Sequence, residues 1–303
     1  MKILHLLSLT FFIVVSGFLS CETYLDPREF ETSPKMVVHS FFTPGQPWEF
    51  ELSASLNVLN DTAIQIWLDS AIITISGDDG SLVDEFQYEG FGKYSSGQDL
   101  PIAGVTYTLT IQHEGYPDIS ATDKIPVAND PEDFKLQQIE LNGKPWMQMS
   151  ARLSPEDIFY QIIINNQITK TYLKDTGELL VFDELAFIKP ASNSVNLFFQ
   201  FDKGNQLSQK LFLNQWTNHD FSVLSEGGFR KINDTHLIQA TSKWYFYYGS
   251  EAYYKYHLIK ERADVFPGNN VGNVFLKSDH YSNIKNGYGI FAGYNVTIYE
   301  NAF

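Results

Sequence analysis

The chain has 303 residues, with 21 Lys and Arg against 36 Asp and Glu and a formal net charge of −15. That sign argues against nucleic acid, whose binding needs Lys and Arg to displace phosphate counterions, and against adhesion to anionic lipid head groups. Aromatic residues at 15% and hydrophobic residues at 44% exclude a disordered chain and are sufficient for sizeable cores, with two domains expected from the length.

The N-terminus carries an export signal. A lysine at position two precedes the apolar run Ile3 to Val15, and small residues follow before Cys21, which is the order of a signal peptide. The run is too short for a membrane-spanning helix, which needs about 20 apolar residues. We therefore expect residues 1–20 to be a signal peptide that is not part of the fold.

Cys21 is the only cysteine in the chain, which excludes a disulfide scaffold. The segment Phe18 to Cys21 resembles a bacterial lipoprotein lipobox, with Phe18 where Leu is usual. The alternative is an ordinary signal peptide with a chance cysteine near its end. We predict lipidation of Cys21, whose acyl chains would hold the protein at a membrane, and a flexible tether over residues 21–34.

The next region alternates apolar and polar residues with period two, which predicts half-buried strands. In one such run, Trp48, Phe50, Leu52, Ala54 and Leu56 share a face. Others cover residues 36–42, 71–75, 82–88, 105–111 and 119–127. About seven short strands in roughly 95 residues predict an antiparallel β-sandwich domain over residues 35–128.

Between two of these runs, Gly77-Asp78-Asp79-Gly80 is typical of a hairpin turn, after which residues 82–88 would return as one strand. The alternative for Asp78 and Asp79 is weak Ca²⁺ binding, although the spaced oxygen ligands of a calcium loop are missing. We favour the turn.

The polar segment Ala128 to Asp133 contains Pro131 and predicts a domain boundary. The region that follows, residues 129–303, is also rich in alternating runs, at 147–153, 158–164, 195–201 and 236–248. We therefore expect a mainly β protein with two β-sandwich-like domains of the immunoglobulin or carboxypeptidase-regulatory type.

One helix is expected near the C-terminal end of the second domain, over about residues 250–264. Ser250 would be its N-cap and Glu251 would lie in its first turn. Its apolar residues repeat at helical spacing, which would place one face in the core: Ala252, Tyr256, Ile259 and Ala263.

Aromatic residues concentrate between Trp244 and Tyr256. Alternation places Trp244, Phe246 and Tyr248 in the core, and helical spacing places Tyr256 there. That leaves three tyrosines as candidates for an exposed face that contacts a ligand or a partner: Tyr245, Tyr247 and Tyr254. The alternative is that all of these rings pack in the core.

No catalytic or metal motif is present in the sequence. The histidines after the signal peptide are scattered without metal-ligand spacing: His39, His113, His219, His236, His257 and His280. No nucleophile elbow occurs. Gly287 to Gly293 lacks the spacing of a phosphate loop, and glycines before a strand such as Tyr294 to Tyr299 more often permit close backbone approach. We expect no enzyme activity, metal or cofactor.

Several segments occur in an order that resembles a known family. They are Cys21 with its acidic tether, Lys35 to Val38, Ala71 to Ile75, Gly92 to Tyr94, Gly104 to Leu109, Ser250 to Tyr253 and Ser282 to Phe291. Together they resemble the uncharacterised Bacteroidota lipoprotein family called domain of unknown function 4249, over nearly the whole mature chain. The resemblance implies a β-rich lipoprotein of the outer membrane whose relatives often accompany TonB-dependent transporters, and it implies no catalytic residues.

These observations lead to one expected function and two alternatives. The expected function is a non-enzymatic binding or accessory subunit of a TonB-dependent outer-membrane receptor. The first alternative is a structural or adhesin-like envelope lipoprotein. The second is a glycan-active hydrolase that uses paired carboxylates.

Overall fold

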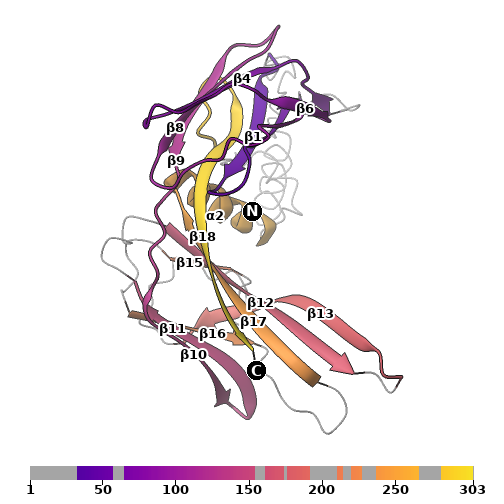
Figure 1. The fold of residues 1–303 in the computed structure, drawn as a ribbon, viewed down its shortest axis with the longest axis vertical. Coiled ribbons are helices and arrows are strands. Elements are labelled where there is room, and N and C mark those ends of the chain that lie inside the picture. Colours follow the sequence, from indigo (N-terminus) through magenta and orange to yellow (C-terminus); the bar gives the residue numbers. More distant parts are fainter. Residues whose placement is uncertain are drawn as a thin grey trace, which may run out of the picture. The chain divides into compact units, whose positions relative to one another are not determined.

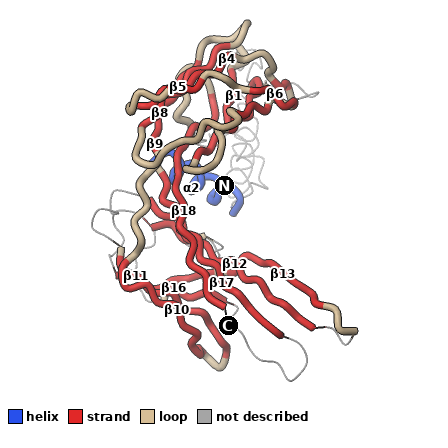
Figure 2. Tube along the Cα trace, viewed as in Figure 1, coloured by secondary structure: helices blue, strands red, loops and turns tan. Residues whose placement is uncertain are grey.

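The computed structural model describes residues 33–56, 65–153, 161–173, 176–191, 210–213, 220–226, 237–265 and 281–302. Most of these residues lie in strands, and they include one helix, α2 (Glu251–Val265) (Figures 1 and 2). The mainly β expectation is confirmed. Within the described part of the chain, no helix is long and apolar enough to cross a membrane.

The described strands of the first sandwich include β1 (Met36–Phe42), β2 (Glu49–Ala54), β3 (Ile66–Trp67), β4 (Ile72–Gly77), β5 (Leu82–Val83), β6 (Gln87–Gly90), β7 (Lys93–Ser95), β8 (Thr106–Gln112) and β9 (Ile119–Lys124). One sheet has the order β5-β4-β8-β9. The facing strands are ordered β1-β2-β7-β6, with β3 also paired to β2. Apolar residues of both sheets form one core, as the period-two pattern predicts.

The alternating run from Trp48 is confirmed as far as Ala54, and its four apolar residues are buried. Leu56 is 38% exposed, so its predicted place in the core is wrong. The physical reason is that β2 ends at Ala54, and the last backbone hydrogen bond to the neighbouring segment is the one from the Ser55 N–H to the Lys35 carbonyl, so Leu56 lies beyond the paired strand.

The turn at residues 77–80 is confirmed. The Gly77 N–H donates to the Ser81 carbonyl at 2.9 Å, and the Asp79 carboxylate accepts the Ser81 N–H at 3.0 Å. The single return strand over 82–88 is wrong, because the chain crosses between the sheets here. β5 pairs with β4 in one sheet, whereas β6 pairs with β7 in the other.

The second sandwich is built from β10 (Glu132–Leu141), β11 (Lys144–Arg152), β12 (Gln161–Leu173), β13 (Leu179–Ala186), β14 (Ile188–Pro190), β15 (Leu211–Leu213), β16 (Asp220–Glu226), β17 (Leu237–Gly249) and β18 (Tyr288–Ala302). Its four-stranded sheet has the order β10-β11-β16-β14, and the facing strands are β13-β12-β17-β18, with β15 paired to β12. A second core joins the two sheets, with Met147 and Met149 on one side and Trp244, Phe246 and Tyr248 on the other. Two sandwich-like units are therefore confirmed. The expected strand at 195–201 lies outside the described residues.

β18 belongs to both units. Its residues 294–302 pair antiparallel with β17, and its residues 288–293 pair in parallel with β1. The parallel pair corrects the expectation of a purely antiparallel first sandwich. The region 129–303 thus supplies a strand to the sheet that contains β1 and β2, and strand pairing crosses the expected boundary near residue 128.

Two glycines of β18 allow close backbone approach, Gly289 to β1 and Gly293 to β9. A Cβ on Gly289, whose φ is +106°, would lie 1.9 Å from the Val38 carbonyl oxygen, and one on Gly293 would lie 2.4 Å from that of Lys124. The prediction that these glycines permit close backbone approach is confirmed.

The predicted helix is also confirmed. The Ser250 hydroxyl oxygen accepts the Tyr253 N–H at 3.1 Å, which is the N-cap contact. Helix α2 packs on the face of β12, β15 and β18 that points away from the second core, through Ala252, Tyr253 and Tyr254.

Candidate functional site

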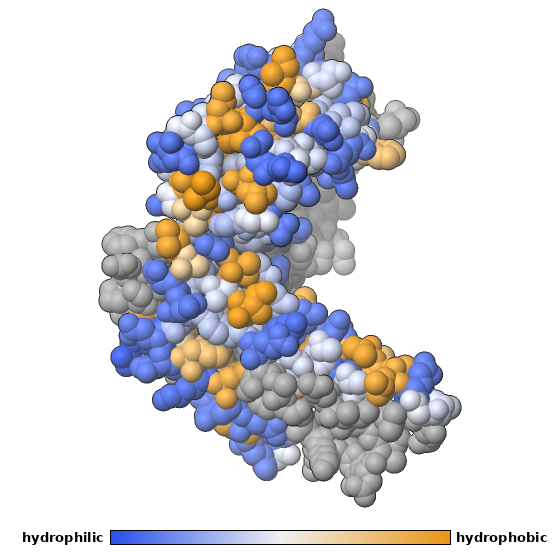
Figure 3. Space-filling model, viewed as in Figure 1, coloured by the Kyte–Doolittle hydropathy of each residue, from blue (hydrophilic) through white to orange (hydrophobic). Residues whose placement is uncertain are grey.

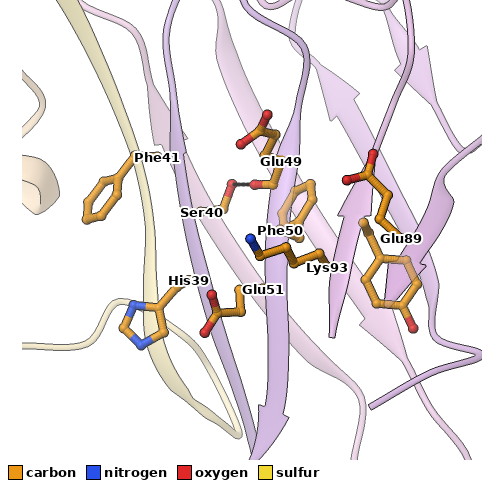
Figure 4. A pocket seen from close by; sticks show the side chains of 9 residues that line it. His39, Ser40, Phe41, Glu49, Phe50, Glu51, Glu89 and Lys93 are labelled. Atoms are coloured by element: carbon orange, nitrogen blue, oxygen red, sulfur yellow. Dashed lines mark hydrogen bonds between the residues drawn. The ribbon is translucent and has the colours of Figure 1, made fainter. Parts of the chain in front are cut away.

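A pocket of about 400 Å³ lies on the outer face of β1, β2, β6 and β7, and Figure 4 shows its side chains. Alternation along the strands directs His39, Phe41, Glu49 and Glu51 to this face, whereas the intervening Ser40 and Phe50 are buried. The pocket is lined by His39, Ser40, Phe41, Glu49, Phe50, Glu51, Glu89, Lys93 and Tyr94.

The pocket carries more negative than positive charge. Glu49 and Glu51 lie two residues apart on β2, and Lys93 is opposite Glu51 in the β2–β7 register. In Figure 4 the Lys93 side chain extends across β2 between these two carboxylates. Within the described residues, no ion pair involves Lys93, Glu49 or Glu51. Their charges are therefore available to a ligand.

Two further polar side chains of the pocket, those of Ser40 and Glu89, already form hydrogen bonds within the protein. The Ser40 hydroxyl donates to the Glu49 carbonyl at 2.8 Å, and the Ser95 hydroxyl donates to the Glu89 carboxylate at 2.5 Å. Ser40 is thus held by the backbone of the neighbouring strand, with no general base in contact, and it is not arranged as a nucleophile.

His39 contacts Tyr256 of α2 from the pocket, with ring centroids 6.2 Å apart. Burial lowers the pKa of His39, the Glu51 carboxylate opposes this shift, and Lys260 adds to it. The imidazole is therefore predominantly neutral at pH 7. In Figure 4 the Glu51 carboxylate lies beside it. The pocket thus presents three carboxylates, one ammonium group and one neutral imidazole.

A row of aromatic rings leads away from the pocket. Phe41 contacts Tyr253 with ring centroids 5.5 Å apart, and Tyr253 stacks on Tyr294 at 4.8 Å. Tyr294 contacts Tyr247 at 6.1 Å, and Tyr247 stacks on Tyr245 at 6.1 Å. The pocket is therefore connected by ring contacts to two of the tyrosines that the sequence singled out.

Those two tyrosines are half-buried. The Tyr245 hydroxyl donates to the Gln167 side chain at 2.9 Å. Burial raises the pKa of Tyr247, and a hydrogen bond with the Asn165 side chain partly offsets this. Their role in contacting a ligand or partner stays a prediction.

The third candidate, Tyr254, is only 4% exposed and packs edge-on against Phe212. The exposed position expected for it is wrong. Helix α2 turns Ala252, Tyr253 and Tyr254 toward the sheet, whereas Tyr256 is half-buried and contacts His39 with ring centroids 6.2 Å apart. Rotation of a helix about its axis is set by what it packs against, which the helical repeat alone does not specify.

The sequence reasoning missed the pocket itself. Glu49 and Glu51 have the pattern of an ordinary solvated strand face, and only strand pairing places Lys93 and Glu89 beside them. Among the described residues, no group of three or more His, Cys, Asp or Glu could hold a metal ion. Cys21, His219, His236 and His280 lie outside the described residues.

Comparison with solved structures finds collagen adhesin from S. aureus, at 9% identity over 89% of this chain and 94% of that one, with a TM-score of 0.18. It also finds the collagen-binding domain of the Erysipelothrix rhusiopathiae surface protein RspB, at 10% identity over 88% and 96% of the two chains, with a TM-score of 0.16. Scores this low carry no argument about fold or function.

No curated protein matches the chain. A family model, described as Domain of unknown function (DUF4249), matches residues 22–300 and names no enzymatic activity. Because the match covers nearly the whole chain, this protein belongs to the DUF4249 family.

Proposed function

We propose that this chain is a non-enzymatic, lipid-anchored binding protein of the outer membrane that captures a small ligand and delivers it to a TonB-dependent transporter. The anchor would be Cys21, the only cysteine in the chain. Ligand capture would take place in the pocket on β1, β2, β6 and β7.

The observation that carries the binding role is the set of unpaired charges around Lys93. Glu49 and Glu51 can accept charge-assisted hydrogen bonds from an ammonium group, and Lys93 can donate to a carboxylate on the same ligand. The excess of carboxylates disfavours phosphates and other polyanions. The chemistry fits a small zwitterion, such as an amino acid or short peptide with a free amine.

The carboxylates do not support the glycan-hydrolase alternative. The general acid of a glycosidase is a carboxyl group whose pKa is raised in an apolar enclosure. Glu49, Glu51 and Glu89 are all exposed to solvent. The pocket therefore offers charge complementarity and no visible acid–base pair.

Calorimetric titration at low salt with amino acids and dipeptides tests the binding role. We expect Glu51→Gln to weaken binding of a free-amine ligand about tenfold, corresponding to about 1.4 kcal/mol. The exposed residue Glu114, which lies outside the pocket, provides the matched control Glu114→Gln. N-acetylated ligands should bind the wild-type protein no better than they bind Glu51→Gln. Equal binding of free-amine ligands to both variants would contradict the assignment.

Two further experiments test the anchor and the partner. A Cys21→Ala variant should lose acyl label and leave the membrane fraction, so a membrane-bound variant without label would contradict the anchor. A pull-down from detergent-solubilised outer membrane should recover a TonB-dependent transporter. If no transporter is recovered, a structural or adhesin-like role is favoured instead.

A further inference from the structure

A two-residue turn at the edge of the first sandwich exposes an aromatic ring in an unusual backbone conformation. Phe91 and Gly92 connect β6 to β7 with φ values of 53° and 73°, and Gly90 pairs with Lys93 across the turn. Turns with two positive φ values favour Asn, Asp or Gly at the first position. A bulky residue there is strained.

The fold explains the residue type at one of the two turn positions but not at the other. Gly92 is required, because a Cβ there would lie 2.2 Å from the Leu52 carbonyl oxygen. Phe91 has no such reason, since its side chain is 75% exposed and gains little from packing within the fold. A strained and exposed aromatic residue points to a contact outside the chain.

Two more exposed aromatic side chains surround this turn. The Trp67 ring lies against it, since a Cβ on Gly92 would be 2.9 Å from Trp67 Cε3. The Tyr88 hydroxyl accepts the Gly92 N–H at 3.4 Å. Trp67 is 37% and Tyr88 45% exposed. We call Trp67, Tyr88 and Phe91 the aromatic tip.

The aromatic tip lies close to the place where the chain continues toward Cys21. The Leu52 N–H donates to the Gly92 carbonyl at 2.8 Å, and the Ser55 N–H donates to the Lys35 carbonyl at 2.8 Å. Leu52 and Ser55 are three residues apart, or about 10 Å along a strand. The 14 residues from Cys21 to Pro34 can span at most about 50 Å. A lipid on Cys21 would therefore keep the tip within reach of the bilayer.

We propose that the aromatic tip inserts into the head-group region of the bilayer and orients the anchored protein, an inference that rests on the lipid anchor of the proposed function. Trp and Tyr favour the membrane–water interface, where one part of the ring system is apolar and another is wet. Because the chain has a net charge of −15, anionic head groups would repel it. We therefore expect the tip to contact zwitterionic lipids.

A bilayer suits the tip better than a protein partner does. A stable protein interface buries about 800 Å² on each side, whereas the tip consists of three side chains around one turn. A bilayer accepts such an isolated apolar projection, and the tether makes weak insertion effective by keeping the local concentration high.

Depth-dependent fluorescence quenching provides the test. The mature chain, residues 21–303, would be joined through Cys21 to a maleimide lipid in phosphatidylcholine vesicles with brominated acyl chains. We expect the bromines to quench part of the tryptophan emission, and this part to disappear in Trp67→Phe. Because the lipid is attached chemically, the result does not depend on whether the cell acylates Cys21.

Phe91→Asn should reduce the quenching of Trp67 at least threefold while leaving the protein folded, since Asn suits the turn better than Phe. Ile102→Asn is the matched control, because Ile102 is also exposed in the first sandwich and lies outside the tip. Absence of quenching in the wild-type protein would overturn the proposal. So would equal quenching in wild type and Phe91→Asn. A protein contact would be assigned to the tip instead if two results occurred together. Trp67 would not be quenched, and a partner protein recovered with wild type in a pull-down would be lost with Phe91→Asn.

Discussion

The Ser250 hydroxyl donates a hydrogen bond to the Asp123 carboxylate while its oxygen accepts the Tyr253 N–H that caps α2. The same carboxylate accepts the Gly293 N–H at 2.8 Å. One half-buried acid therefore connects β9, the start of α2 and β18. Burial raises the pKa of Asp123 to about 6 from 3.8, against the opposing effect of these hydrogen bonds.

The first prediction concerns Asp123→Asn. A raised pKa means that the folded protein holds the proton more tightly than the unfolded chain, so the Asp123 contribution to stability is present below pH 3.8 and is lost as the pH rises through 6. The full difference is about 3 kcal/mol. The unfolding free energy of Asp123→Asn should therefore rise relative to wild type between pH 4 and 7 in urea titrations. Exposed Asp69→Asn is the control, and parallel curves for wild type and Asp123→Asn would contradict the prediction.

The second prediction concerns His257, which stacks on Phe41 with ring centroids 5.3 Å apart. Burial lowers the pKa of His257 to about 4 from 6.5, with help from Lys210 and Lys260. Here the unfolded chain binds the proton more tightly, so this contribution is present above pH 6.5 and is lost as the pH falls through 4. His257→Phe keeps an aromatic ring but cannot take up a proton. Between pH 7 and 4, its free energy of unfolding should therefore fall by about 3 kcal/mol less than that of wild type.

His257 and Asp123 act in opposite directions over the same pH range, so the wild-type curve alone does not separate them. Measurements on His257→Phe, on Asp123→Asn and on the double variant do. His113→Phe, at a half-buried histidine outside this cluster, is the control. If His257→Phe and His113→Phe both show the same acid response as wild type, the buried environment inferred for His257 is contradicted.

The third prediction concerns the parallel pair of β1 and β18. Gly289→Ala would place a Cβ 1.9 Å from the Val38 carbonyl oxygen at a positive φ, so the two strands must separate. We expect a loss of about 3 kcal/mol or more in thermal or urea unfolding. Gly45 also has a positive φ, but its Cβ would meet nothing within 4 Å. Gly45→Ala should therefore cost only about 1 kcal/mol, and equal losses would show that close approach at Gly289 is unimportant.

The fourth prediction concerns a polar network in the second core. The Asn166 amide donates to Ser225 at 2.8 Å, and the Ser242 hydroxyl donates to the Asn166 carbonyl oxygen at 2.8 Å; all three residues are fully buried. Asn166→Leu leaves the Ser242 hydroxyl without this acceptor and should cost about 1–3 kcal/mol. Adding Ser242→Ala should recover part of that loss in a double-mutant cycle. A double variant less stable than Asn166→Leu would indicate that packing dominates.

Local patterns predicted the local elements well. The alternation from Trp48 to Ala54 and in residues 105–111 corresponds to buried strand faces, because a strand repeats every two residues wherever it pairs. Ser250 marked the start of α2, because an N-cap needs only the three residues that follow it. The acidic turn at residues 77–80 was predictable for the same reason.

Other features needed the tertiary structure. Tyr254 is buried because the sheet beneath α2 selects which side of the helix faces inward, and residues 82–88 divide between two sheets because each part has a different partner strand. The pocket depends on Glu51 and Lys93 being opposite each other in paired strands that are far apart in the chain.

The sequence by itself determined the β-rich character and the lone Cys21, which follow from composition and short-range spacing. It also contains the ordered segments from Cys21 to Phe291 that resemble the family. Only the tertiary structure decided that the end of the chain completes the sheet that contains β1, and that Asp123 lies beneath the cap of α2. The physical reason is that short-range patterns specify period and caps. Hydrogen bonds between strands more than two hundred residues apart form only when the cores on both sides of the sheet are in place.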